Sequence, residues 1–329
     1  MRKWLLAAFL VFTLALPAQA AQTVVGFITG ASGLGDLSFN DMAYGGIRRA
    51  QQEYNFKLII LKPDKSGVTT PEGVLSVVGQ SDIIVLLGAQ HEQQTRQAAL
   101  ANPEKKFIYI ELPVEGAPNI SSVMFNQNEG SFLAGALAAL VSKTGKIGFV
   151  GGTREPPVMA FEQGYREGAA YADPDVEVLA EYISPAGDFS GFGDPEKGHD
   201  ITMKQYDQGA DIVFAVAGLS GNGVIEAARR SGKFAIGVDS DQDSLAKGSV
   251  LTSMMKRLDV AAYAELKAAL ENRFTPGVTR YGLANDGVAL TEMKYTRHLI
   301  PADVFDKIED ITRKIVSGKL KVTNLLPSN

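Results

Sequence analysis

Two segments of the sequence carry side chains from which a small-molecule clamp could be built. Residues 35–40 (Gly-Asp-Leu-Ser-Phe-Asn) follow a predicted strand, and residues 238–242 (Val-Asp-Ser-Asp-Gln) end another strand far downstream. An aromatic ring, an amide and a carboxylate at strand ends suit a flat, hydroxylated small molecule. Phe39 would be the stacking platform, since aromatic rings stack well on heterocycles. The alternative for Phe39 is a ring packed in the core under the helix that follows.

The loop 187–195 (Gly-Asp-Phe-Ser-Gly-Phe-Gly-Asp-Pro) is the second aromatic candidate. Two aromatic residues among glycines are costly to expose without a purpose. Either Phe189 or Phe192 could therefore supply the opposing stacking face. The alternative is that both rings tuck under the loop, which ends where Asp194 caps the next helix.

Polar groups at other strand ends could complete the site. Gly218 opens a turn whose backbone amides could receive a polar group, although a tight turn between strand and helix explains the same pattern. Asp239 and Asp241 share a strand end, and a carboxylate there can accept two hydroxyl hydrogen bonds from a sugar. We favour Asp239 for the ligand, since one of the two could form the turn. Lys256 could donate to the same hydroxyls or pair with Asp239.

Little in the sequence points to catalysis or to a cofactor. The chain has 3 histidines, far apart and without metal-ligand spacing, and no cysteine. The glycines near residue 30 do not have the spacing of a dinucleotide or phosphate loop, and no serine hydrolase or zinc protease motif occurs. We therefore expect a binding protein with no cofactor and no metal.

Strand and helix patterns alternate along the chain in two successive series, which predicts an α/β protein with two doubly wound parallel-sheet lobes. We expect short crossings between the lobes near residues 121–127, 250–256 and 283–289, which together form a hinge. In such sheets ligands bind beyond the carboxyl ends of the strands. The expected division is lobe 1 (21–124 and 252–282), lobe 2 (125–251 and 283–300), and a C-terminal helix and tail (301–329).

Composition and the N-terminus indicate the compartment. The 329-residue chain has a net charge of −5 and no basic run, so nucleic acid is not an expected partner. A charged start, an apolar run from Trp4 to Leu16 and the ending Ala18-Gln-Ala20 predict a secretory signal cleaved after Ala20. A bacterial lipoprotein anchor needs a cysteine, which the chain lacks. We expect a monomer free in the periplasm.

Several motifs, in this order, resemble the basic membrane protein family, the purine nucleoside receptor-like substrate-binding proteins of ABC transporters. The similarity extends over most of the chain to about residue 260. The matching segments are 36–40 (Asp-Leu-Ser-Phe-Asn), 128–135 (Asn-Glu-Gly-Ser-Phe-Leu-Ala-Gly), 148–152 (Gly-Phe-Val-Gly-Gly), 161–164 (Phe-Glu-Gln-Gly), 192–198 (Phe-Gly-Asp-Pro-Glu-Lys-Gly), 209–211 (Gly-Ala-Asp), 237–242 (Gly-Val-Asp-Ser-Asp-Gln) and 251–257 (Leu-Thr-Ser-Met-Met-Lys-Arg).

The resemblance implies the type I periplasmic binding protein fold and a nucleoside held between Phe39 and Phe192, or Phe189 in its place. It further implies delivery of the ligand to an ABC permease in the inner membrane. By the same resemblance the other ligand contacts are Asn40 at the base, Asp239 at the ribose hydroxyls with Lys256 beside it, and Glu111 as the acidic residue that follows its strand.

Two departures from the family pattern bear on the ligand. The family usually has an aspartate at the end of the first strand that bonds the purine edge, where this chain has Gly30. The basic residue that commonly precedes the Phe-Glu-x-Gly motif is also missing. The ligand could therefore be a nucleoside, a free base or another heteroaromatic molecule. A sensory receptor for the same ligands is the alternative function, and a nucleoside-processing enzyme is a third.

Overall fold

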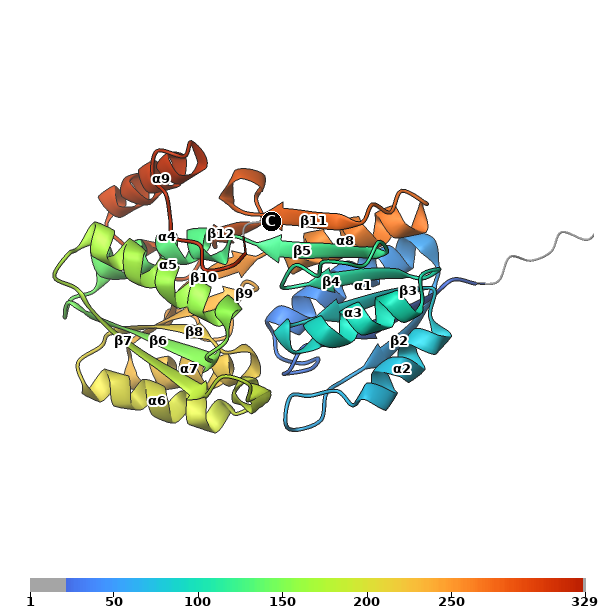
Figure 1. Cartoon of the computed structure of the whole chain (residues 1–329). Coiled ribbons are helices and arrows are strands. Elements are labelled where there is room, and N and C mark those ends of the chain that lie inside the picture. Colours follow the sequence, from blue (N-terminus) through green and yellow to red (C-terminus); the bar gives the residue numbers. More distant parts are fainter. Residues whose placement is uncertain (1–21, 328–329) are drawn as a thin grey trace, which may run out of the picture.

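A computed structural model describes residues 22–327 of the chain; the expected signal segment, residues 1–20, lies outside this range. Within it the chain forms two six-stranded sheets, which lie in two lobes side by side and are covered by helices on both faces (Figure 1). The predicted class, an α/β protein with two doubly wound lobes, is confirmed. No helix within residues 22–327 is long and apolar enough to cross a membrane.

The first sheet has the strand order β11-β5-β4-β3-β1-β2, and all its neighbouring strands are parallel. Helices α1, α2, α3 and α8 belong to this lobe. The strands are β1 (Val24–Ile28), β2 (Lys57–Leu61), β3 (Ile83–Leu87), β4 (Lys106–Ile110), β5 (Ile120–Phe125) and β11 (Gly277–Tyr281), and the helices are α1 (Phe39–Tyr54), α2 (Pro71–Gln80), α3 (Glu92–Ala101) and α8 (Leu258–Leu270).

The second sheet has the order β12-β10-β9-β8-β6-β7, with β12 antiparallel to β10 and the other neighbours parallel. Its strands are β6 (Lys146–Thr153), β7 (Glu177–Ser184), β8 (Ile212–Val216), β9 (Phe234–Asp239), β10 (Val250–Lys256) and β12 (Val288–Leu290), and its helices are α4 (Gln127–Val141), α5 (Pro156–Ala172), α6 (Pro195–Asp207), α7 (Gly221–Ser231) and α9 (Ala302–Val316).

Continuous apolar runs form the central strands because both faces of a parallel sheet are covered. Every residue of β3 is buried, and so is every residue of β8. The helices instead carry apolar residues on one face only. In α1 the buried positions are 40, 43, 46, 47 and 50, which is the spacing of a helix that packs one side on a sheet.

Three short crossings connect the lobes and are hydrogen-bonded to one another. The first follows β5, where the amide of Asn126 donates to the carbonyl oxygen of Tyr281 at 2.7 Å. The third follows β11, and in it the amide of Leu283 donates to Glu129 at 2.9 Å. The amide of Arg257, in the second crossing, donates to the carbonyl oxygen of Gly287 at 2.9 Å. The chain therefore changes lobes through one joint.

The second crossing differs from the sequence expectation. We expected residues from 252 onward to lie in the first lobe. In the structure β10 continues to Lys256 in the second sheet, where it pairs with β9 on one side and β12 on the other. The chain crosses only at Arg257. β12, a short strand of 3 residues, covers the edge of β10, and its few residues carry little strand signal.

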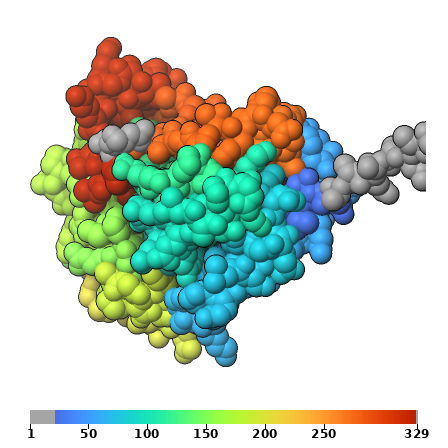
Figure 2. Space-filling view, turned by 45° about the vertical axis from the view of Figure 1, so that its right-hand side comes forward, coloured from blue at the N-terminus to red at the C-terminus, as the bar shows by residue number. Residues whose placement is uncertain are grey.

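The C-terminal segment packs on the second lobe. Ile311 and Ile315 of α9 are buried against Phe132 and Leu133 of α4. Figure 2 shows the red C-terminal residues beside the green part of the chain, at the end away from the blue N-terminal lobe. The tail then runs back toward the joint, where Leu326 is buried.

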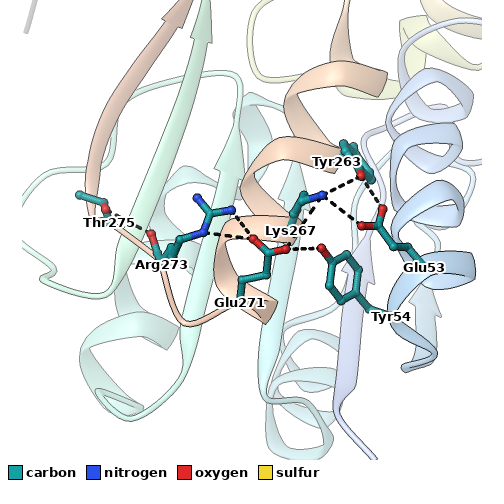
Figure 3. Close-up of polar contacts among 7 residues, drawn as sticks. All are labelled: Glu53, Tyr54, Tyr263, Lys267, Glu271, Arg273 and Thr275. Atoms are coloured by element: carbon teal, nitrogen blue, oxygen red, sulfur yellow. Dashed lines mark hydrogen bonds and ion pairs between the residues drawn. The ribbon is translucent and has the colours of Figure 1, made fainter.

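A polar cluster ties the C-terminal ends of α1 and α8 together at the surface (Figure 3). Lys267 donates to Glu53 at 3.0 Å, and the hydroxyl of Tyr263 donates to the same carboxylate. Tyr54 donates to Glu271. The hydrogen bond from Tyr263, and after it that from Lys267, lowers the pKa of Glu53 to about 2. Because the cluster is exposed, its contribution to stability is small and sensitive to salt.

Close contact of the α1 and α8 backbones generates a first prediction. A Cβ atom at Gly46 would overlap the carbonyl oxygen of Asp259, whereas a Cβ at the exposed Gly45 would meet nothing within 4 Å. We expect Gly46→Ala to lower the free energy of unfolding by about 1–3 kcal/mol, because the helices must move apart. The matched Gly45→Ala should raise it by about 0.5–1 kcal/mol, because alanine favours the helix. Urea unfolding measures both; equal effects would show that the helices are not in close contact.

Candidate ligand-binding site

A cavity of about 630 Å³ lies between the two lobes, where the loops that follow the strands of both sheets meet. Its position beyond the strand ends matches the general rule for open parallel sheets. All the residues predicted from the sequence except Asp241 line it. They are Phe39, Asn40, Glu111, Phe189, Phe192, Gly218, Asp239 and Lys256.

Aromatic rings enter the cavity from opposite lobes. Phe39 is the first residue of α1, and Phe192 ends a short 3-10 helix (Phe189–Phe192) that follows β7. Phe192 packs over the backbone of Gly152, where a Cβ atom would overlap its ring. A Cβ at Gly30 would lie 3.2 Å from the ring of Phe39, so the glycine leaves the face beside that ring open. The two glycines thus shape the space around the rings.

Phe189 also lines the cavity, but it lies where the lobes touch. A Cβ atom at Gly67, in the loop after β2, would come 2.7 Å from the carbonyl oxygen of Phe189. Gly67 has a φ of +77°, a conformation that glycine adopts without strain. Gly218 likewise lies near the other lobe, since a Cβ there would come 2.9 Å from Ser32 Oγ.

Asn40 lines the cavity, as expected, but its side chain is also bonded within its own loop. Its Nδ2 donates to Asp36 at 2.9 Å and to Ser32 at 3.0 Å, so both amide hydrogens are used. Its Oδ1 accepts from the amide of Gly30 at 2.6 Å and keeps one lone pair. Asn40 therefore fixes the loop after β1 beside the cavity and can offer a ligand an acceptor only.

Asp36 organises this loop and received no role in the sequence analysis. The carboxylate is fully buried and accepts hydrogen bonds from the amides of Ser38, Asn40 and Asp41. It also accepts from the side chains of Ser32 and Asn40. Burial raises the pKa of Asp36, and these bonds act in the opposite direction. The position of Asp36, just before a helix start, was the signal that could have indicated this role.

Lys256 forms an ion pair with Glu111 rather than with Asp239. Lys256 Nζ, on β10 of the second sheet, lies 2.9 and 3.1 Å from the two oxygens of Glu111, which follows β4 of the first sheet. Both side chains are buried, with 1% and 7% of their surface exposed. Two of the three ammonium hydrogens serve Glu111. The third is left for a group inside the cavity.

Three aromatic rings surround the ammonium group of Lys256. The Nζ atom lies 5.1 Å from the ring centre of Phe39, 5.2 Å from that of Phe125 and 5.6 Å from that of Phe161. A cation over ring faces is attracted by their negative charge density. The rings thus help to keep a charged amine in a site that excludes water.

Asp239 lies buried at the end of β9, in a left-handed backbone conformation with a φ of +64°. Its Oδ2 accepts from Ser38 Oγ of the opposite lobe at 2.5 Å. Burial raises the pKa of Asp239 to about 7, although Lys256 and the Ser38 bond favour the ionised form. A strained backbone and a shifted pKa are typical of functional positions.

The loop before α1 is hydrogen-bonded to the second lobe, and we call these contacts the inter-lobe latch (residues 37–38 and 238–242). The carbonyl oxygen of Leu37 accepts from Ser240 Oγ at 2.6 Å and from Gln242 Nε2 at 3.1 Å. Leu37 itself is 47% exposed and has a φ of +55°. With the bond between Ser38 and Asp239, the latch holds the lobes closed over the cavity.

Asp241 does not line the cavity, which corrects its expected ligand role. The residue is exposed, and its Oδ1 accepts from the amide of Asp243 at 3.0 Å. This is the local bond by which aspartate shapes a turn. Among residues 22–327, no group of three or more His, Cys, Asp or Glu side chains is arranged to hold a metal ion.

The cavity has further polar lining that the sequence analysis missed. Gln90 follows β3, Thr153 ends β6, and Glu155 comes just before α5. Each lies at or just beyond the carboxyl end of a strand, which was the available signal. Glu155 already accepts from the amide of Gly187 at 2.6 Å.

Asp239 makes stability depend on pH with a definite sign. Its pKa is about 7 in the fold and about 3.9 in an unfolded chain, so the folded state binds the extra proton between these values. The contribution of Asp239 to the free energy of unfolding therefore falls as pH rises from about 4 to about 7. We expect Asp239→Asn to reduce this fall in urea unfolding curves. An unaltered slope in Asp239→Asn would contradict the assignment.

Comparison with known proteins agrees with this geometry. The family of PnrA-like ABC transporter substrate-binding proteins (Bmp) matches residues 22–325. Basic membrane protein A of Borreliella afzelii is 34% identical over 296 residues, which cover 87% of each chain. The CD4+ T-cell-stimulating antigen of Listeria monocytogenes is 30% identical over 326 residues, with 91% of this chain and 87% of that protein covered.

Solved structures show the same architecture. A solute-binding protein of an ABC transporter system from Aeropyrum pernix K1 superimposes with a TM-score of 0.82 at 27% identity, covering 93% of this chain and 94% of its own. A second solute-binding protein, from Conexibacter woesei, has a TM-score of 0.71 at 22% identity and supports the fold alone. The chain therefore has the type I periplasmic binding protein fold and belongs to the PnrA-like family of ABC transporter substrate-binding proteins.

Proposed function

We propose that this protein is a periplasmic receptor, acting as a monomer, that closes on a nucleoside or a related heteroaromatic molecule and delivers it to an ABC permease in the inner membrane. One observation carries the proposal. A single cavity between the lobes is lined by Phe39 and Phe192 from opposite sides, next to the buried polar groups of Asp239 and Lys256.

The chemistry of these groups matches the two halves of a nucleoside. A flat base between two rings gains stacking energy that does not depend on its exact substituents. The buried Asp239 can accept hydrogen bonds from sugar hydroxyls, and such bonds favour its ionised form. The remaining hydrogen of Lys256 can serve the same sugar.

The charge of the site favours an uncharged ligand. Three carboxyl groups, those of Asp36, Glu111 and Asp239, influence one another in the buried region, where Lys256 supplies the positive charge. A phosphate group would add further negative charge to this region, at a high cost in a medium of low dielectric constant. We therefore expect nucleosides rather than nucleotides.

The transport role rests on the family and on the way the lobes close. The latch joins backbone and side chains of both lobes around the cavity, so a bound ligand would be enclosed. A ligand that contacts both lobes favours the closed form by its differential affinity for that form. A permease can then distinguish loaded from empty receptor by shape.

Ligand binding is tested by thermal unfolding of the purified protein with nucleosides, free bases, nucleotides and sugars. A ligand at about 100 times its Kd should stabilise the protein by about 2.7 kcal/mol. We expect a raised Tm with at least one nucleoside and none with its 5′-phosphate. A shift with sugars alone would overturn the proposal.

Alanine variants of the aromatic residues test which rings hold the base. We expect Phe39→Ala and Phe192→Ala each to weaken nucleoside binding by about 1–3 kcal/mol, the cost of losing one stacking ring. Phe189→Ala is the matched control and should cost less, because this residue lies at the contact between the lobes. Isothermal titration gives the three values. If Phe189→Ala costs more than Phe192→Ala, the stacking roles are reversed.

A further inference from the structure

Gln90 is a cavity-lining residue whose side chain carries an unpaired hydrogen-bond donor. The residue lines the cavity, and its Nε2 atom is buried without a hydrogen-bond partner within residues 22–327. An amide nitrogen removed from water and left unpaired destabilises a protein. Such atoms are rare in folded chains, and each calls for an explanation. A ligand atom in the cavity would supply the missing partner.

The sheet places Gln90 between two other candidate positions. Strands β1, β3 and β4 lie next to one another, in parallel register that pairs Ile28 with Leu86 and Leu87 with Ile110. The loops beyond these strands carry Gly30, Gln90 and Glu111 in the same order. Gln90 therefore stands at the middle of the first lobe's cavity wall.

The loop that carries the glutamine is fixed from behind. His91 is buried; its Nδ1 donates to the carbonyl oxygen of Leu87 at 2.7 Å, and its Nε2 accepts from Thr69 Oγ1 at 2.7 Å. The hydroxyl of Tyr109 donates to the carbonyl oxygen of Gly88 at 3.0 Å. Gly88 has a φ of +91°. The backbone that carries position 90 is thus fixed before any ligand arrives.

The residues on either side of Gln90 in the first lobe, Gly30 and Glu111, offer a ligand no free side-chain hydrogen-bonding group of this kind. Gly30 has no side chain to accept a ligand hydrogen. Both oxygens of Glu111 are already bonded to Lys256. A carboxylate at position 30 would select a ligand N–H, whereas an amide N–H selects an acceptor.

We propose that Gln90 donates a hydrogen bond from Nε2 to an acceptor atom of the bound heteroaromatic ring, and so selects among bases by the edge that faces the first lobe. This inference rests on the proposed function. Rings with an unprotonated nitrogen or a carbonyl oxygen on that edge are bound. Rings with an N–H there are bound more weakly, because the amide must turn to present Oε1 and its Nε2 then stays unpaired.

The test uses isothermal titration of the full chain with adenosine, inosine, guanosine, cytidine and thymidine. The nucleoside with the lowest Kd is then titrated into Gln90→Leu and Gln90→Glu. Both variants are expected to bind about tenfold more weakly or worse, because neither side chain can donate the bond. Gln93→Leu, at an exposed position of α3 outside the cavity lining, is the matched control and should bind as the unaltered protein does.

Analogues of the ligand test the same bond without altering the protein. Replacing one acceptor atom of the base by C–H, as in the deaza nucleosides, should weaken binding about tenfold at one position only. That loss should disappear in Gln90→Leu, since the two groups act as a pair. Binding of Gln90→Leu and Gln90→Glu within twofold of the unaltered protein would overturn the inference while nucleoside binding stands. Absence of any nucleoside binding would overturn the proposed function, and this inference with it.

Discussion

The buried ion pair between Lys256 and Glu111 is the interaction on which the closed site depends. It joins the second sheet to the first beside the cavity, with both side chains almost completely removed from water. Either group alone would be an uncompensated buried charge, which is far more costly than the pair. Three rings around the ammonium and the neighbouring Asp239 share the same environment. The distance between the two walls of the cavity is therefore set by a contact that neither lobe can satisfy alone.

Backbone strain gathers at the same place. Leu37, Glu111 and Asp239 all have positive φ values, of +55°, +150° and +64°, and none of them is glycine. Glu111 follows β4, Asp239 ends β9 and Leu37 lies just before α1, and each makes a contact with the opposite lobe. Such conformations persist only where the surroundings over-determine them. Here the hydrogen bonds of Asp36 hold one loop, and the ion pair holds another. Stability is thus lowered locally at contacts between the lobes, while the central strands of the sheets remain buried.

Much of the architecture was predictable because its signals are local. The buried strands appear as apolar runs, and the one-sided apolar spacing of α1 is likewise encoded within the helix itself. Most of the candidate residues, which were chosen because they lie beyond strand ends, line the cavity. The exception is Asp241, which closes a turn outside the cavity lining. The bonds of Asn40 to Asp36 and Ser32 were not predictable, because they depend on how the loop folds. Gln90 was not predicted as a site residue, because the sequence around it is uniformly polar. Its place at the cavity becomes visible only when β3 is seen to lie between β1 and β4.

The central claim is that the two lobes enclose a nucleoside-like molecule, and the ligand that the protein carries from the cell tests it most directly. Protein purified from the periplasm without unfolding can be denatured, and the released small molecules identified by mass spectrometry. The account predicts one nucleoside or related heteroaromatic compound per chain, without a phosphate group. A sugar, an amino acid or a nucleotide released in equal amount to the protein would contradict it.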